Sequence, residues 1–418
     1  MNKALRLTRL ALATLLGISM AAKAQDLVIT NGRILDGKGG ITPNGTVVIR
    51  GGKIESVTTG RQTVNGMKVV DAGGKTVMPG FVEGHRHVIT GDAATWLAER
   101  APAQMQGFLD AGFTTVLSAI DGPPIVAARD RIAKGEMVGP RLYTGTFIPV
   151  AGAAPGAPAS QGDPARTDPA RLGGGDKPAP AVPRDAIVAA VQNAKKAGYD
   201  YLKCVVNTTP GGPEIDTLKL IIAEGKKVGM PTIVHAVSVK DTLLVVDAAP
   251  AMLVHTPHIG RLDTDAAAVK KIAGAGIPMT STLAVFAPHF DDKGTPLFRD
   301  EKPFPWDTLS SAGQGPVNAR ILWEAGLTYG YGTDTQWPPK QSLHDELRAL
   351  SLVFSPAEIV KIITTGAAAA TLHGDQFGSL QAGKLGDVVI VDGDPMRDVT
   401  ALERVVTTVK EGKVVFQK

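Results

Sequence analysis

The feature that most constrains the fold of this chain is the repeated alternation of short apolar runs with amphipathic stretches through its central part. Runs rich in β-branched residues predict strands, and segments with apolar residues every three or four positions predict helices. One helix is expected over residues 214–228, where Ile215, Leu218 and Ile222 share a face and Gly229 provides a stop. The expected strands are residues 76–78 leading into 81–87, then 114–118, 141–147, 201–206, 232–237, 252–255, 279–283 and 327–332.

Eight strands separated by helical segments predict an α/β fold, a (β/α)8 barrel of the TIM type over residues 76–375. The flanking segments 25–75 and 376–418 show short apolar alternations broken by glycine and asparagine, which predict one composite β-sandwich domain. Residues 151–183 are rich in Ala, Gly and Pro and are expected to form a flexible insertion loop. Because it follows the third strand, this loop is either a lid on the C-terminal face or a tolerated insertion.

The first 24 residues have the pattern of a secretory signal peptide. Lys3, Arg6 and Arg9 precede an apolar run over residues 10–22, and Ala22-Lys23-Ala24 offers a small-x-small cleavage site. The apolar run is too short to span a bilayer comfortably, although a retained N-terminal helix is the alternative interpretation. We therefore expect a periplasmic or secreted protein with no stable membrane anchor after cleavage.

Charge and cysteine content exclude several classes of protein. The net charge of the chain is +4, and the four positive charges of residues 1–24 account for all of it, so the processed chain is close to neutral. No clustered basic run remains to follow phosphates, which argues against a nucleic-acid partner. The single cysteine, Cys204, permits neither an intramolecular disulfide nor a thiolate zinc finger. The sequence does not decide the oligomeric state and leaves a homo-oligomer open.

A histidine pair stands at the end of the first predicted barrel strand. The alternation of a strand turns His85 and His87 to one side and Arg86 to the other, so two imidazole nitrogens can converge. Neutral imidazoles suit Zn²⁺ or a similar divalent ion. Taken alone, such a pair is more often structural or incidental than a metal site.

Four further candidate ligands lie at or just past the ends of other predicted strands: Lys203, His235, His255 and Asp334. All of them are expected to face the same mouth of the barrel. Lys203 is unusual because an ammonium group does not bind a cation and is costly in an apolar strand. Either carbamylation by CO₂ turns it into an anionic ligand, or it forms a salt bridge with Asp334 or with a substrate carboxylate.

Three segments resemble signatures of the amidohydrolase superfamily. Residues 77–87, which end in His85-Arg86-His87, resemble its opening Pro-Gly-x-x-Asp-x-His-x-His motif, with Glu83 where aspartate is more frequent. Residues 332–334 resemble its Gly-Thr-Asp at strand eight, and residues 378–387 resemble its return into the β-domain, with Gly386 where alanine is usual. The pattern is most similar to the imidazolonepropionase-like and prolidase-like branch, which includes Xaa-Pro and Xaa-Arg dipeptidase-like members.

The resemblance implies a binuclear centre with two divalent metal ions, most typically zinc. His85 and His87 with Asp334 would hold one ion, His235 and His255 the other, and a carbamylated Lys203 would bridge them. Such a centre lowers the pKa of a bridging water and polarises a scissile carbonyl, while Asp334 acts as general base and then acid. The expected substrate is a small amide, peptide or ester, and His258 and Tyr331 are the weaker candidates for substrate contacts.

Other functions remain open at this stage. A deaminase of an aminated heterocycle would use a single metal without Lys203, and a lactonase would use the same fold. A third alternative is an exported binding protein with a decayed site. The relatives that cleave dipeptides often have a tyrosine and a glycine where this chain has Val237 and Thr256, so the resemblance keeps the metal ligands but leaves dipeptide specificity open.

Overall fold

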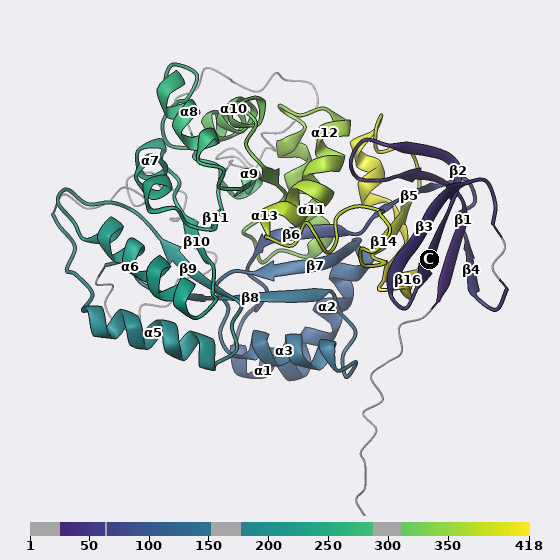
Figure 1. Cartoon of the computed structure of the whole chain (residues 1–418), viewed down its shortest axis with the longest axis horizontal. Coiled ribbons are helices and arrows are strands. Elements are labelled where there is room, and N and C mark those ends of the chain that lie inside the picture. Colours follow the sequence, from purple (N-terminus) through teal and green to yellow (C-terminus); the bar gives the residue numbers. More distant parts are fainter. Residues whose placement is uncertain (1–25, 63–64, 152–176, 287–310) are drawn as a thin grey trace, which may run out of the picture.

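The computed structural model describes residues 26–62, 65–151, 177–286 and 311–418 (Figure 1). The predicted signal peptide at residues 1–24 lies outside the described residues, and so does most of the predicted loop at 151–183. Two sheets organise the rest of the chain, one in the centre and one built from both ends (Figure 1).

The central sheet is the barrel predicted from the sequence. Its strands follow one another in chain order, and each printed neighbour pair is parallel, which confirms the (β/α)8 architecture. The strands are β6 (Phe81–Arg86), β7 (Phe113–Ser118), β8 (Arg141–Phe147), β9 (Tyr201–Val205), β10 (Thr232–His235), β11 (Met252–Leu253), β12 (Met279–Thr280) and β13 (Tyr329–Gly330).

The barrel closes where its first and last strands meet, along a seam formed by residues 84–87 and 331–335. Gly84 N donates to the carbonyl of Tyr331 at 3.0 Å, and Thr333 N and Asp334 N donate to the carbonyl of His85 at 3.1 and 2.7 Å. These bonds continue the ladder beyond the end of β13. The chain segments that carry the predicted ligands His85 and Asp334 are therefore adjacent.

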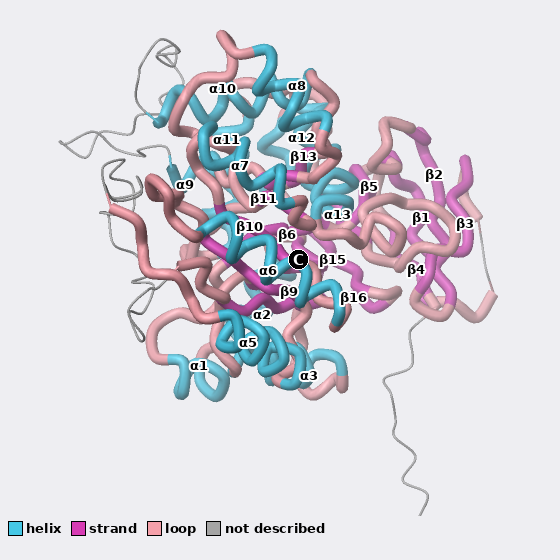
Figure 2. Tube along the Cα trace, turned by 60° about the vertical axis from the view of Figure 1, so that its left-hand side comes forward, coloured by secondary structure: helices cyan, strands magenta, loops and turns pink. Residues whose placement is uncertain are grey.

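Helices cover the outside of the barrel (Figure 2). The predicted helix at 214–228 is observed as α6, with Leu218, Ile221 and Ile222 buried against the strands and Gly229 in the left-handed region that ends it. The described helices are α1 (Ala93–Glu99), α2 (Ala101–Asp110), α3 (Pro124–Ala133), α5 (Arg184–Lys196), α6 (Glu214–Lys227), α7 (Val239–Ala248), α8 (Ala266–Gly274), α9 (Leu283–Phe286), α10 (Ser311–Glu324), α11 (Pro339–Leu350), α12 (Pro356–Lys361) and α13 (Ala367–Ala370), with a π-helix at Ile362–Gly366 and a 3₁₀-helix at Val399–Glu403.

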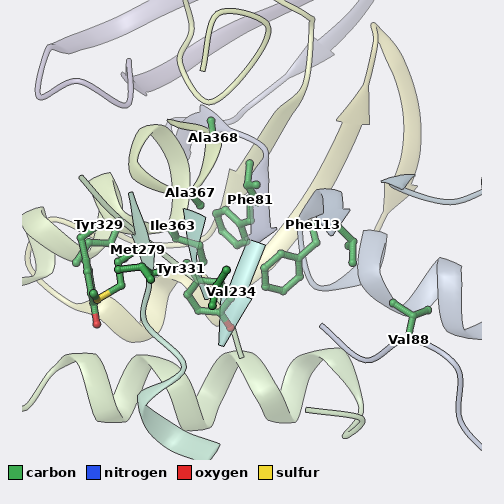
Figure 3. Close-up of a cluster of buried hydrophobic side chains, with 14 of the residues drawn as sticks. Phe81, Val88, Phe113, Val234, Met279, Tyr329, Tyr331, Ile363, Ala367 and Ala368 are labelled. Carbon is green, nitrogen blue, oxygen red and sulfur yellow. The ribbon is translucent and has the colours of Figure 1, made fainter. Parts of the chain in front are cut away.

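Apolar side chains fill the space between the strands and these helices. Phe81, Phe113 and Tyr331 belong to this core, and they lie close together in Figure 3. A second cluster, which includes Tyr201 and Ile233, fills the barrel itself. In the described part of the chain, none of the helices combines the length and the apolar character that a membrane crossing requires.

The second sheet is assembled from both ends of the chain, as the sequence predicts. It has the order β16-β15-β14-β5-β1-β2-β3, with β4 paired to β1, and it buries its own apolar cluster. Its strands are β1 (Leu27–Leu35), β2 (Ile41–Arg50), β3 (Lys53–Thr59), β4 (Lys68–Asp71), β5 (Thr76–Pro79), β14 (Val388–Val391), β15 (Val405–Lys410) and β16 (Lys413–Gln417).

One strand prediction is wrong. Residues 76–78 were expected to lead into the first barrel strand, but β5 pairs with β14 and β1 in the second sheet. The chain changes sheets at Gly80, whose N–H donates to the carbonyl of Asp387 at 3.0 Å. A side chain at Gly80 would overlap Thr114, so only glycine fits this corner.

Candidate metal centre

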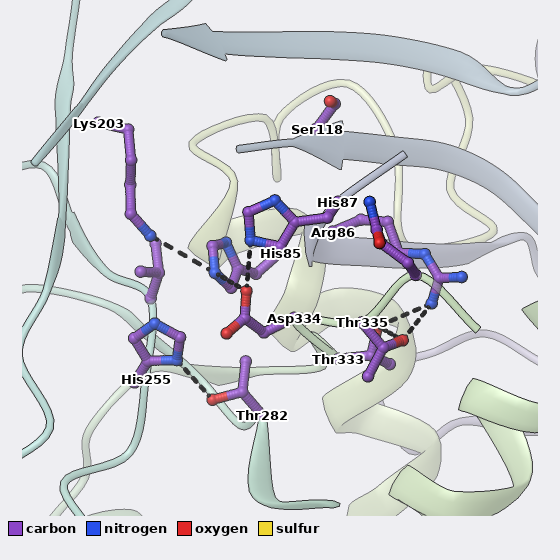
Figure 4. Close-up of polar contacts among 12 residues, drawn as sticks. His85, Arg86, His87, Ser118, Lys203, His255, Thr282, Thr333, Asp334 and Thr335 are labelled. Atoms are coloured by element: carbon purple, nitrogen blue, oxygen red, sulfur yellow. Dashed lines mark hydrogen bonds and ion pairs between the residues drawn. The ribbon is translucent and has the colours of Figure 1, made fainter. Parts of the chain in front are cut away.

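The structure brings all six predicted ligand residues to the C-terminal mouth of the barrel, and all six are buried. Figure 4 labels five of them, all but His235. They come from five strands: His85 from β6 and His87 just beyond it, Lys203 from β9, His235 from the end of β10, His255 from just past β11, and Asp334 from past β13. Because parallel strands present their carboxyl ends at one face, residues far apart in the sequence meet there.

Asp334 lies between the two histidines of the first strand. Its Oδ1 is 3.0 Å from His85 Nε2 and 2.8 Å from His87 Nε2. Both imidazoles therefore point to one side of the strand, as the alternation predicts, and Arg86 points to the other (Figure 4).

The remaining three residues complete the cluster from the other side of the mouth. Lys203 Nζ is 3.4 Å from His85 Nε2. The ring of His255 is edge-on to those of His85 and His235, with ring centroids 4.9 and 4.4 Å apart. One donor atom from each of His85, His255 and Asp334 lies within 4.8 Å of the other two. The two ligand sets implied by the resemblance thus adjoin in space.

Burial sets the charge of these groups. Desolvation, with the charge of Lys203 nearby, lowers the pKa of His85 to about 3. Burial and the neighbouring His235 lower the pKa of His255 well below its ordinary value. Burial opposes ionisation of Asp334, but His85 and His87 facing its carboxylate hold its pKa well below the usual range. The site therefore presents neutral imidazoles beside a carboxylate.

This donor set fits a divalent cation. Neutral imidazole nitrogens and a carboxylate oxygen are the ligands that zinc and similar ions bind. Within the described residues, His255 Nε2 is buried and makes no hydrogen bond, which is costly unless something else satisfies it. A cation bound in this cluster would satisfy it.

Two neighbours that were not selected from the sequence hold these ligands in place. Thr282 Oγ1 lies 2.9 Å from His255 Nδ1, which leaves Nε2 to face the cluster. Asp121 accepts hydrogen bonds from Val88 N and Ile89 N at 2.6 and 3.3 Å and fixes the chain just after His87. Asp121 comes just after the predicted strand at 114–118, and Thr282 lies near the end of the predicted strand at 279–283, so position at a strand end was the available signal for both.

The two weaker predictions have different outcomes. His258 is buried beside the site, and its ring stacks on Phe286 with centroids 4.0 Å apart, while Phe286 also meets the ring of His255 at 5.1 Å. A substrate contact for His258 stays a prediction. Tyr331 packs against Phe113 in the core, and its hydroxyl donates to the carbonyl of Ser342 in α11 at 3.4 Å. We therefore assign Tyr331 to the core and not to substrate binding.

Comparison with known families bears directly on this site. Residues 76–415, which include the whole barrel and all six clustered residues, match the amidohydrolase family. The chain belongs to that family. The resemblance drawn from the three sequence signatures is thus confirmed.

Individual relatives place this amidohydrolase near two groups. It is 25% identical to an imidazolonepropionase of Salinispora arenicola (strain CNS-205) over 87% of this chain and 90% of that protein. It is 28% identical to an imidazolonepropionase of Shouchella clausii (strain KSM-K16), but that match covers 47% of this chain and only 40% of the relative. A crystal structure of a Xaa-Pro dipeptidase with methionine bound in its active site shares the fold, with a TM-score of 0.73, 21% identity and coverage of 93% and 99% of the two chains. The chain is thus similar to an imidazolonepropionase over most of its length and shares its fold with a Xaa-Pro dipeptidase.

Proposed function

We propose that this chain is a binuclear metal-dependent hydrolase that cleaves a carbon–nitrogen bond in a small amide or peptide-like molecule, or a related ester. The observation that carries the proposal is the convergence of four histidines, a lysine and an aspartate from five strands on one buried point. Family membership supports the same reaction class.

The ligand roles are those that the family resemblance implies. His85, His87 and Asp334 would hold one cation, His235 and His255 a second, and a carbamylated Lys203 would bind both. Zinc fits this set best because most of the donors are imidazole nitrogens. When bound, such cations acidify a water molecule and polarise the carbonyl of the scissile bond.

Asp334 is the proposed general base. Its carboxylate is ionised and held by two imidazoles, so its position at the mouth is fixed before substrate arrives. It would accept a proton from the attacking water and return it to the leaving nitrogen or oxygen. His258 and Phe286, stacked beside His255, would form one wall of the substrate pocket.

Lys203 is the proposed bridge. Its neutral amine would add to CO₂ and lose a proton, which gives a carbamate with two oxygen ligands. A carbon-13 NMR signal after exchange with labelled bicarbonate, present in the wild type and absent from Lys203→Ala, would support this modification. A wild-type protein that binds two ions but shows no such signal would contradict it.

Metal content and turnover together test the proposal. We expect two zinc equivalents per chain and hydrolysis of at least one member of a panel of amides, N-acyl amino acids, dipeptides, esters and lactones. The matched variant Lys203→Ala should retain about one equivalent. One ion per wild-type chain with release of ammonia from an aminated heterocycle would instead indicate a mononuclear deaminase, and failure to bind metal would refute the proposal.

We also propose that the enzyme is exported and works in the periplasm or outside the cell, on the pattern of residues 1–24. Sequencing of the N-terminus of protein recovered from each cell fraction tests this. A processed chain that begins at Gln25 outside the cytoplasm is expected, and a full-length cytoplasmic chain would contradict export.

A further inference from the structure

A fully buried arginine lies directly behind the proposed metal centre. Arg86 stands between His85 and His87, but its guanidinium points away from the mouth and is fully buried. Its Nη1 donates to the hydroxyls of Thr333 and Thr335 at 3.1 and 2.7 Å (Figure 4). Nη1 also donates to the hydroxyl of Ser342 at 2.6 Å, and Nη2 donates to the carbonyl of Trp337. One planar group thus binds four positions of the chain that follows the last barrel strand.

Two of these acceptors flank Asp334, one on each side. Thr333 and Thr335 turn their hydroxyls toward Arg86, whereas Asp334 between them turns its carboxylate to the histidines. Asp334 has a φ of 53°, in the left-handed region that residues other than glycine seldom adopt. Such a conformation persists at functional sites only where the surrounding structure enforces it.

Glu83 completes the arrangement from the first strand. Its carboxylate accepts hydrogen bonds from Thr333 N and Thr333 Oγ1 at 3.0 and 2.9 Å and from His85 N at 3.0 Å. The Thr333 hydroxyl therefore accepts from Arg86 and donates to Glu83. The network connects both sides of the seam, and it includes the neighbours of three proposed ligands.

We propose that Arg86 is a positioning residue of the metal centre, whose forked guanidinium holds the segment 333–337 so that Asp334 stays in its left-handed conformation and meets His85 and His87. Burying a guanidinium is costly unless its hydrogen bonds are made. Here those hydrogen bonds fix the segment that carries a proposed metal ligand. The inference rests on the proposed function, because Asp334 must be a ligand and base for its position to matter.

A comparison of Arg86→Lys with Arg141→Lys tests this role. Arg141, at the start of β8, is also largely buried, binds Asp387 and Glu411, and has its guanidinium over an aromatic ring, as Arg86 does. Both variants keep the positive charge and lose the planar fork, since lysine offers only a point of charge. The two readouts are zinc affinity, by competition with a chelator, and the separate values of kcat and KM.

We expect Arg86→Lys to bind zinc about 10- to 100-fold more weakly and to lose kcat by a similar factor with KM nearly unchanged. Arg141→Lys should lower the thermal midpoint but leave zinc affinity and kcat as in the wild type. A folded Arg86→Lys with wild-type zinc affinity and kcat would overturn the proposal, and so would equal losses in both variants.

Thr335→Val gives a milder test in case Arg86→Lys fails to fold. It keeps the branched shape, removes one acceptor of the fork, and should weaken zinc binding in the same direction by a smaller factor. Unchanged zinc affinity in a folded Thr335→Val would contradict the inference. A wild-type protein that binds no metal and hydrolyses nothing would refute the proposed function. If the wild type binds metal and is active, and the variants have the same zinc affinity and kcat, only the role of Arg86 is refuted.

Discussion

Buried ionisable groups are arranged differently at the two ends of the barrel. At the end next to the second sheet, Arg141 pairs with Asp387 at 2.7 Å and with Glu411, and Lys410 Nζ donates to the carbonyl of Gly139 at 2.9 Å. At the mouth, neutral imidazoles crowd around Asp334, which has a left-handed backbone. At the first end the charges are paired within the chain, whereas at the mouth the donor atoms are arranged as ligands for a divalent cation. We therefore expect the first end to contribute to stability and the mouth to function.

The largest expected effect is on turnover. Asp334→Asn keeps the shape of the side chain but removes its ability to accept a proton, so kcat should fall about 10³-fold. Steady-state kinetics measure this, and circular dichroism should show the wild-type fold. Retention of full turnover by the variant would remove Asp334 from its role as base.

A substitution at the opposite end of the barrel should lower the free energy of unfolding and leave turnover unchanged. Arg141→Met leaves the carboxylate of Asp387, which is 4% exposed, without its cation, so unfolding should become easier by about 3 kcal/mol. Urea unfolding measures the loss, with kcat per folded molecule near that of the wild type. A large fall in kcat at unchanged stability would break the contrast between the two ends.

Metal should stabilise the mouth through its binding energy. Zinc at about 100 times its dissociation constant should raise the free energy of unfolding by about 2.7 kcal/mol, since the unfolded chain does not hold the site together. Urea unfolding with zinc and with a chelator gives the difference. His255→Ala should lose most of this gain, and an undiminished gain would place the zinc elsewhere.

The smallest expected effect concerns pH. Burial lowers the pKa of His258 to about 4, whereas the unfolded chain protonates this imidazole near pH 6.5. Between these values the unfolded state binds more protons, so acid favours unfolding. In the presence of a chelator, His258→Phe should lose about 1 to 2 kcal/mol less stability than the wild type between pH 7 and pH 5. Equal losses in the two proteins would show that His258 is not buried in its neutral form.

Much of the candidate site could be predicted because ligand positions coincide with strand ends. His235 and His255 end or follow short apolar runs, and parallel topology alone brings such positions to one mouth. Contacts across the seam could not be predicted in this way. The sequence gives no reason to pair Arg86 with Thr335, 249 residues away, or to expect a left-handed Asp334.

Residues 76–79 and Tyr331 also show that contacts between distant segments are hard to predict from the sequence. Residues 76–79 have the composition of a barrel strand, yet they pair with β14, because a strand's partners depend on the direction the chain takes at Gly80. Tyr331 precedes Asp334 by three positions, yet its ring packs against Phe113 in the core.

The sequence by itself determined the alternating architecture, the family and the identity of the donor groups, since periodicity and residue chemistry are local properties. Only the tertiary structure decided which donors touch, which nitrogen each imidazole presents, and which side chains hold the ligands from behind. Those depend on distances between segments far apart in the chain, and packing around the closed barrel sets these distances.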